Sequence, residues 1–273
     1  MSVTNRKVGP WARLALGALP FALLVGAYAV GSYIRLSENP ADKLLPSLPD
    51  MAETFWRMAA EPDKRSGDLL LWSDTWLSLM RLGGGVIIAA FISVCLGVLI
   101  GFLPRARATL APFVAAISLI PPITILPILF IVFGLGETAK VALIVIGTAP
   151  VMTRTLAQAV MDIPREQIVK AETLGASALQ MIVRVVLPQM WPRLITAIRL
   201  GLVPAWIFLI SAEAIASTGG LGYRIFLVRR YLAMDVILPY VAWITLLAYI
   251  LDRILQFASQ RLFRWAHLEG ESL

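Results

Sequence analysis

Cysteine and histidine are almost absent from this chain, in which Cys95 and His267 are the only residues of their kinds. A single cysteine forms no disulfide framework and no multi-cysteine metal site within the chain. A single histidine supplies neither a His/Cys set for zinc nor a Ser/His/Asp triad. These absences argue against most enzyme chemistry. We therefore expect no catalytic residue and no metal site.

Charged residues are also scarce, at 15% of the chain, whereas 59% of the residues are hydrophobic and the mean hydropathy is +0.79. An ordinary soluble domain is about 45–50% apolar, so this excess predicts a protein whose solvent is lipid. The net charge is +7, but the 24 Lys and Arg residues are scattered between apolar segments. Membrane orientation explains that distribution better than nucleic acid, which we do not expect as a partner.

Six apolar runs predict about six transmembrane helices, because a helix needs about 20 apolar residues to cross a bilayer. The runs that reach this length without a charge are 14–34, 82–103 and 108–136. The shorter runs, each bounded by charged residues, are 141–153, 200–212 and 236–251. The shorter runs cross the bilayer only if their flanking charges lie at its margins or face a polar cavity. The predicted fold class is an all-α membrane protein.

The basic residues orient these helices. They gather before the first run and after the second, fourth and sixth, and the positive-inside rule places those connections in the cytoplasm. Residues 35–78 hold eight acidic and five basic residues and belong outside. We expect a cytoplasmic N-tail with the first helix in 1–34, and an extracytoplasmic segment with a short interfacial helix in 35–78. A core of five helices follows in 79–256, then a cytoplasmic C-tail in 257–273. Both termini then lie in the cytoplasm.

The connection between the fourth and fifth runs, residues 156–192, has the pattern of two helices around a glycine corner. Pro164 suits the first turn of a helix, and Gly175 can adopt the positive φ that ends one. Ser177 can cap a second helix, which Pro188 is expected to stop. A short exposed helix with a rigid glycine corner is suited to transmit motion to a partner.

This connection resembles the EAA loop of type I ABC importer permeases, in which a Glu-Ala-Ala start precedes a glycine and a Leu-Pro pair at fixed spacing. The residues in register are Ala171, Gly175, Val185, Leu187 and Pro188. The start departs from the pattern, since Val169 and Lys170 stand where Glu and Ala are expected, and Glu172 is the candidate to replace the missing acid. The residues expected to couple to an ATPase are Glu166, Lys170, Ala171, Glu172, Thr173, Gly175, Ala176, Leu187 and Pro188.

Further segments resemble one branch of these importers, the nitrate/sulfonate/taurine family. The segments that match in order are Leu45-Pro46-Ser47, Ser78-Leu79-Met80-Arg81, Ile120-Pro121-Pro122, Ala212-Glu213-Ala214 and Gly219-Gly220-Leu221-Gly222-Tyr223. Each segment alone is a weak signal, and their collinear order over about residues 40 to 265 makes the resemblance specific.

The resemblance implies a permease subunit that imports a small anionic solute, such as nitrate, a sulfonate or taurine, across the bacterial cytoplasmic (inner) membrane. The implied partners are a second copy of this chain, two cytoplasmic ATPase subunits, an extracytoplasmic solute-binding protein and membrane lipid. The sequence contains no Gly-x-x-x-x-Gly-Lys-Ser/Thr phosphate loop. We therefore expect this chain to bind no cofactor, and ATP with Mg to bind the ATPase.

The residues expected on the translocation path or its gate are Pro121, Pro122, Thr124, Ser211, Glu213, Arg224 and Arg230. The prolines remove backbone donors in mid-membrane, which leaves a packing kink and a substrate contact both open. Glu213 must be paired or wet at its depth, either with an arginine such as Arg224 or at an outer gate. Arg224, Arg229 and Arg230 break the positive-inside pattern and either attract an arriving anion or contact lipid headgroups.

The alternative function from another class is a secondary transporter driven by an ion gradient. Such a transporter is built from two related halves with charged or unwound sites near the midplane. The sequence contains no convincing internal repeat.

Overall fold

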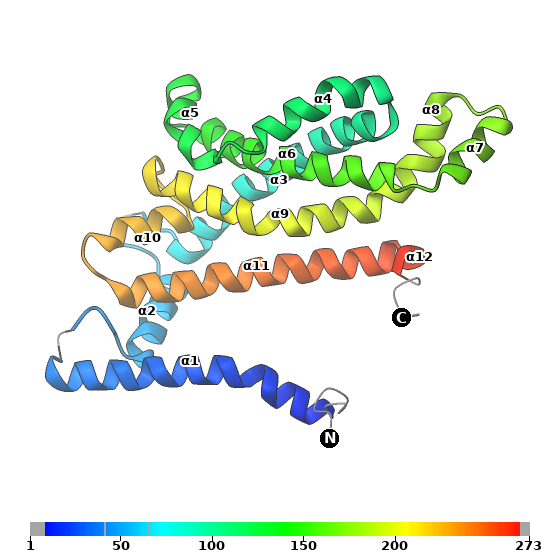
Figure 1. The fold of residues 1–273 in the computed structure, drawn as a ribbon. Helices are drawn as coiled ribbons and strands as arrows, with labels where there is room; N and C mark the ends of the chain where they lie inside the picture. Colours follow the sequence, from blue (N-terminus) through cyan, green and yellow to red (C-terminus); the bar gives the residue numbers. More distant parts are fainter. Residues whose placement is uncertain (1–8, 41, 65, 268–273) are drawn as a thin grey trace. The chain divides into compact units, whose positions relative to one another are not determined.

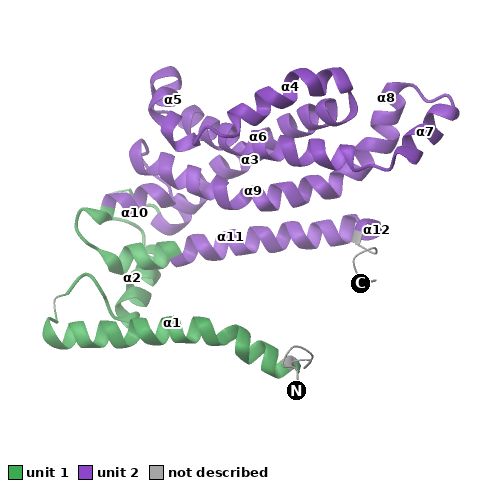
Figure 2. Ribbon diagram, viewed as in Figure 1, with its two compact units in different colours: residues 1–69, 228–241 green, residues 70–227, 242–273 purple. Residues whose placement is uncertain are grey.

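The computed structural model describes residues 9–40, 42–64 and 66–267, and these residues form helices and no strand (Figure 1). The chain divides into two compact units (Figure 2). Unit 1 comprises residues 1–69 and 228–241, and unit 2 comprises residues 70–227 and 242–273.

Unit 1 contains α1 (Pro10–Glu38), α2 (Leu48–Ala60) and the first turns of α11 (Met234–Leu262). The Tyr28 hydroxyl donates to Pro46 O at 2.7 Å, which ties the second half of α1 to the chain that enters α2. The Ser47 side chain caps α2 by accepting from the backbone N–H of Asp50 at 3.2 Å. A helix therefore lies where a short interfacial helix was predicted. The α1 helix also runs past the predicted end of the first span.

The core of unit 2 is built by α3 (Leu70–Phe102), α6 (Glu137–Met161) and α9 (Leu187–Ile215). Glycines let α3 and α6 approach closely, since a Cβ on Gly85 would lie 2.7 Å from Ile144 and one on Gly101 would lie 2.4 Å from Val160. The buried core side chains include Ala89, Val98, Met152, Leu156, Val186, Met190 and Leu194.

In the described part of the chain, five helices are long and apolar enough to cross a membrane, and a bent pair makes a sixth if it is one span. The pair consists of α4 (Pro104–Ile117) and the stretch Pro122–Phe133, bent by 81°. That stretch contains a 3-10 turn, η2 (Pro122–Ile125), and α5 (Leu126–Phe133). The run predicted over 108–136 is therefore broken at its prolines, which agrees with the expected kink, because two successive prolines remove two backbone donors and disfavour helix before them.

Several predicted bounds are also wrong, and charged residues explain the errors. The α3 helix begins at Leu70, although the second span was expected to begin at 82 and residues up to 78 were assigned to the outer segment. Asp74 and Arg81 therefore lie inside this helix, where both are buried. The α6 helix continues to Met161 and α11 to Leu262, beyond their apolar runs. Charges end a run in the sequence, but paired charges do not end a helix.

Candidate functional site

The segment between α6 and α9, residues 162–186, contains α7 (Arg165–Thr173) and α8 (Ala178–Met181), and we call it the α7–α8 segment. The α7 helix ends in a Schellman motif. The N–H of Gly175 donates to Glu172 O at 2.9 Å, and the N–H of Ala176 donates to Ala171 O at 3.0 Å. Gly175 has a φ of +79°, which confirms the predicted positive φ. The segment is shorter than the predicted 156–192, because α6 and α9 extend into that range.

The prediction that Ser177 caps a second helix is confirmed. Its side chain accepts from the Gln180 N–H at 3.3 Å, while the Gln180 side chain accepts from the Ser177 N–H at 2.8 Å. The prediction that Pro188 stops this helix is wrong, since a π-helical turn, η3 (Ile182–Val186), leads directly into α9. A π turn is wider than an α turn, and such bulges accommodate a missing donor without ending the helix.

A glutamine pair ties the α7–α8 segment to α9. The Gln189 side-chain amide donates to the Gln167 side chain at 3.0 Å and to Val185 O at 2.9 Å. Beside this pair lies a cavity of ≈ 660 Å³ that Asp162, Arg193 and other residues of α6, α7, α9 and α12 (Arg264–His267) line. The α7 helix is therefore attached to the membrane-spanning core through specific side-chain contacts.

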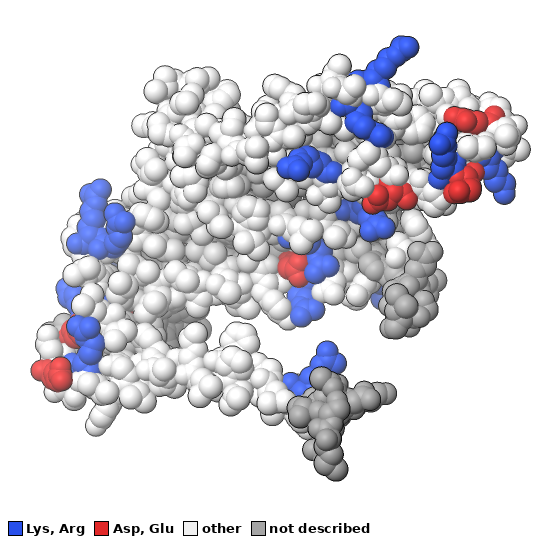
Figure 3. All heavy atoms as spheres, viewed as in Figure 1, with Lys and Arg blue, Asp and Glu red and all other residues white. Residues whose placement is uncertain are grey.

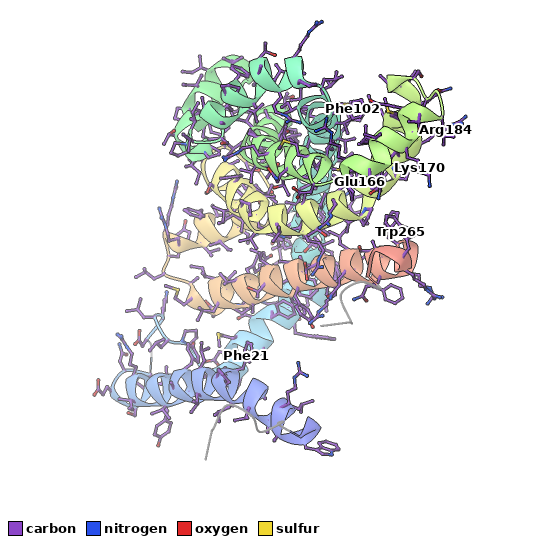
Figure 4. All side chains as sticks on the ribbon, turned by 45° about the vertical axis from the view of Figure 1, so that its right-hand side comes forward. Phe21, Phe102, Glu166, Lys170, Arg184 and Trp265 are labelled. Atoms are coloured by element: carbon purple, nitrogen blue, oxygen red, sulfur yellow. The ribbon has the colours of Figure 1, made fainter. Side chains whose placement is uncertain are left out.

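The α7–α8 segment is otherwise open. No residue of α7 is buried. Figure 4 places Glu166, Lys170 and Arg184 at this end of unit 2, and Figure 3 shows side chains of both charge signs there. Large apolar side chains are exposed beside these charges, with Leu174 80% and Leu179 70% exposed. The predicted coupling residues that are exposed are Glu166, Lys170, Glu172, Thr173, Gly175 and Pro188. Those that are half-buried are Ala171, Ala176 and Leu187.

A second group of polar residues lies at the opposite ends of α3, α6 and α9, and Arg81 of α3 is its centre. The Arg81 guanidinium donates to Glu213 Oε1 of α9 at 2.7 Å and to Gly219 O at 2.8 Å. Its other edge donates to both carboxylate oxygens of Glu137, the first residue of α6, which also pairs with Lys140 at 2.9 Å. Arg81 is 4% exposed, and it joins three helices through two carboxylates.

Glu213 is fully buried. Its carboxylate accepts from Arg81, from the Ser78 hydroxyl at 2.8 Å and from the Gly222 N–H at 2.8 Å. The expected pairing of Glu213 with an arginine is confirmed, but the partner is Arg81 and not Arg224. Glu213 lines no open surface in this structure.

Arg224 lies on α10 (Leu221–Arg229) and pairs with Asp74 of α3 at 2.8 Å. Asp74 also accepts from the Gly220 N–H at 2.9 Å. Arg224 is thus paired with a carboxylate 150 residues away in the sequence. Arg230 is exposed and belongs to unit 1.

Three of the sequence segments that resemble the nitrate/sulfonate/taurine family meet in this cluster, which we call the polar cluster. Its members are Asp74, Ser78, Arg81, Glu137, Lys140, Glu213, the turn 219–222 and Arg224. Gly220 has a φ of +118°, and a Cβ there would lie 2.5 Å from Glu213 Oε1. The sequence analysis did not predict Asp74, Glu137 and Lys140 as members of the cluster. Their charges lie within or beside apolar helices, where a charged residue needs a partner, and this could have indicated them.

The remaining predicted path residues lie in unit 2. The hydroxyl of Thr124 donates to Pro121 O at 2.7 Å, and that of Ser211 donates to Ile207 O at 2.7 Å. Pro122 lines a mostly apolar hollow of ≈ 300 Å³ between α4, η2, α6 and α9. These contacts are intrahelical or local, so Thr124 and Ser211 keep acceptor capacity for other groups.

Residues 77–264 match the protein family described as "Binding-protein-dependent transport system inner membrane component". The "Taurine transport system permease protein TauC" of Escherichia coli (strain K12) is 35% identical over 199 residues, which are 72% of each chain. The "Bicarbonate transport system permease protein CmpB" of Synechococcus elongatus is 29% identical over 206 residues, 74% of this chain and 73% of that relative. A chain of the inward-facing MetNI methionine ABC transporter has a TM-score of 0.55 at 23% identity, covering 69% of this chain and 95% of that one.

Proposed function

Because the chain belongs to the binding-protein-dependent permeases of ABC importers, we propose that it forms, as a homodimer, the path for a small organic anion. Members of this family are integral membrane proteins that work with a separate ATPase and a substrate-binding protein, so this chain is a transport component and not an enzyme. We place it in the bacterial cytoplasmic membrane, in contact with lipid, with both termini in the cytoplasm. The main support for this proposal is the 35% sequence identity to the taurine permease over 72% of each chain.

The α7–α8 segment is the proposed contact with the ATPase. Apolar side chains that project from a water-exposed segment mark a protein–protein interface. Leu174 and Leu179 project in this way beside Glu166 and Lys170, while the Gln167–Gln189 bond links α7 to α9. A movement of the ATPase can therefore reach the spanning helices. Each of two ATPase subunits would hold ATP and Mg, and this chain would hold no cofactor.

The proposed substrate class rests on the named relatives. These relatives are named as permeases for taurine, aliphatic sulfonates and bicarbonate, each of which carries a negatively charged group in neutral water. We infer a small sulfonate or carboxylate for this chain as well.

We expect proteoliposomes that contain this permease, its ATPase and its binding protein to take up taurine only when ATP is present on the ATPase side. The comparison vesicles lack the ATPase and carry a proton or sodium gradient. Uptake driven by the gradient alone would contradict the proposal and favour the secondary transporter.

The proposed orientation predicts labelling from opposite faces of the membrane. In a Cys95→Ala background, a cysteine at Ser66 should react with an impermeant thiol reagent from outside. A cysteine at Leu174, which is 80% exposed, should react only from the cytoplasm. Ser177 is less suitable for this test because its side chain caps α8. Reaction of both cysteines from the same face would overturn the proposed number of crossings between them.

A further inference from the structure

Arg154 lies inside a membrane-spanning helix. It directly follows the apolar run 141–153, and α6 continues for about two more turns to Met161, ~10 Å further along the axis. Its side chain is exposed, and its guanidinium donates to the Ser118 hydroxyl at 3.0 Å.

Some cations of the unit 2 spans have carboxylate partners, whereas Arg154, like Arg193, Arg253 and Arg261 among the described residues, has none. Arg81 pairs with two glutamates, Lys140 with Glu137 and Arg199 with Asp252. Within the part of the chain that the structure describes, Arg154 has no carboxylate within salt-bridge distance. A guanidinium stays charged at any physiological pH, and exposing it to hydrocarbon costs several kcal/mol. An exposed guanidinium on this side of α6 is suited to contact water and an anion.

The hollow of ≈ 300 Å³ opens beside this guanidinium. Ser118, which binds Arg154, is part of its wall, and so are Val151 and Thr155, which lie within one turn of Arg154 on α6. Much of the remaining wall is apolar and includes Leu200 and Phe208 of α9. The site thus combines one cation at its rim with a wall of hydrocarbon.

The size of the hollow suits a small solute, since pockets for drug-sized ligands span about 300–1,000 Å³. Gly147 and Phe208 both line the hollow, and a Cβ on Gly147 would lie 2.2 Å from the Phe208 ring. The Phe208 ring therefore packs directly against the α6 backbone. A solute in this hollow would have room for a short carbon chain only.

We propose that Arg154 and this hollow, together the Arg154 site, bind the anion during its passage. The guanidinium holds the sulfonate or carboxylate through charge-assisted hydrogen bonds, and the apolar wall contacts the carbon chain. One of the five N–H donors of Arg154 is engaged by Ser118, which leaves donors for the anion. Arg154 is then a specificity-determining residue of the path. This inference rests on the proposed function, which supplies the anionic substrate.

The first test needs no knowledge of the substrate. The permease in the whole complex carries Thr155→Cys in a Cys95→Ala background. The new thiol is treated with one of two methanethiosulfonate reagents, the anionic sulfonatoethyl reagent or the cationic trimethylammonioethyl reagent. We expect the anionic reagent to react faster, and Arg154→Gln to lower the anionic-to-cationic rate ratio roughly tenfold. A cysteine that reacts with neither reagent, or a ratio that Arg154→Gln leaves unchanged, would overturn the inference.

The second test measures ATP-driven taurine uptake by the same complex. Arg154→Gln should lower uptake roughly tenfold or more, and Arg154→Lys should retain part of it. Arg261→Gln is the matched control, since Arg261 is an exposed cation in the last turn of α11 over the Phe257 ring.

Two failures are distinguishable in these measurements. Normal taurine uptake by Arg154→Gln would overturn the role of Arg154 and leave the proposed function intact. If the unaltered complex takes up neither taurine nor bicarbonate, the proposed substrate class is wrong, and the thiol rate ratio still decides whether Arg154 faces water and attracts anions.

Discussion

An Arg81→Met substitution should destabilise unit 2 by about 3–5 kcal/mol, because it leaves the buried Glu213 carboxylate without its cation. Glu213 is fully buried, and Ser78 and Gly222 supply its other donors. Glu137, the second partner of Arg81, is 61% exposed and keeps Lys140, so its loss matters less. The measurement is the free energy of unfolding in a denaturant titration of the detergent-solubilised chain.

Two comparisons separate the buried charge from a general effect of losing an arginine. The double variant Arg81→Met/Glu213→Met removes both charges and should recover much of the loss, since apolar replacements of buried pairs are often close to neutral. Arg35→Met breaks the pair with Asp42, in which Arg35 is 47% exposed, and should cost about 0–1 kcal/mol. If Arg81→Met costs no more than Arg35→Met, the polar cluster does not hold the three helices together.

The number of spans could be predicted from the sequence because lipid imposes a length of about 20 apolar residues on each crossing. The bounds could not, because hydropathy treats every charge as the end of a run. Arg81 ended the predicted span and Asp74 lay outside it, yet each is neutralised by a residue from a distant part of the chain. The Arg81–Glu213 pair is separated by 132 residues, and no local pattern contains such a contact.

The corner of the α7–α8 segment was more predictable than the polar cluster because its determinants are local. The Schellman bonds join Gly175 and Ala176 to residues within five positions, and the capping box joins Ser177 to a residue three positions away. Pro188 was misjudged because its effect depends on the π turn before it. The continuation of α6 to Met161 could not be predicted, because its last turns carry exposed polar residues, which a single sequence does not distinguish from a loop.

Replacement of Gly175 by valine should reduce ATP-driven uptake at least tenfold while the chain still inserts and folds. Gly175 has a φ of +79°, a region that β-branched residues rarely adopt. A Cβ at this position would meet no atom within 4 Å, so the substitution strains the backbone of the corner without removing a packing contact. The Schellman bonds of Ala171 and Glu172 depend on that backbone. The measurement is taurine uptake per membrane-inserted complex, with binding-protein-stimulated ATP hydrolysis measured in parallel.

The order of a short substitution series tests whether the positive φ is the cause. Asparagine tolerates the left-handed region better than other non-glycine residues, so Gly175→Asn should retain more uptake than Gly175→Val. Gly84→Ala serves as the control, because Gly84 lies within α3, where a Cβ would meet no atom within 4 Å, and helical backbone accepts alanine readily. Equal loss in the asparagine and valine variants would assign the effect to the added side chain at the ATPase contact. Normal uptake in the valine variant would mean that the glycine corner does not transmit the motion of the ATPase.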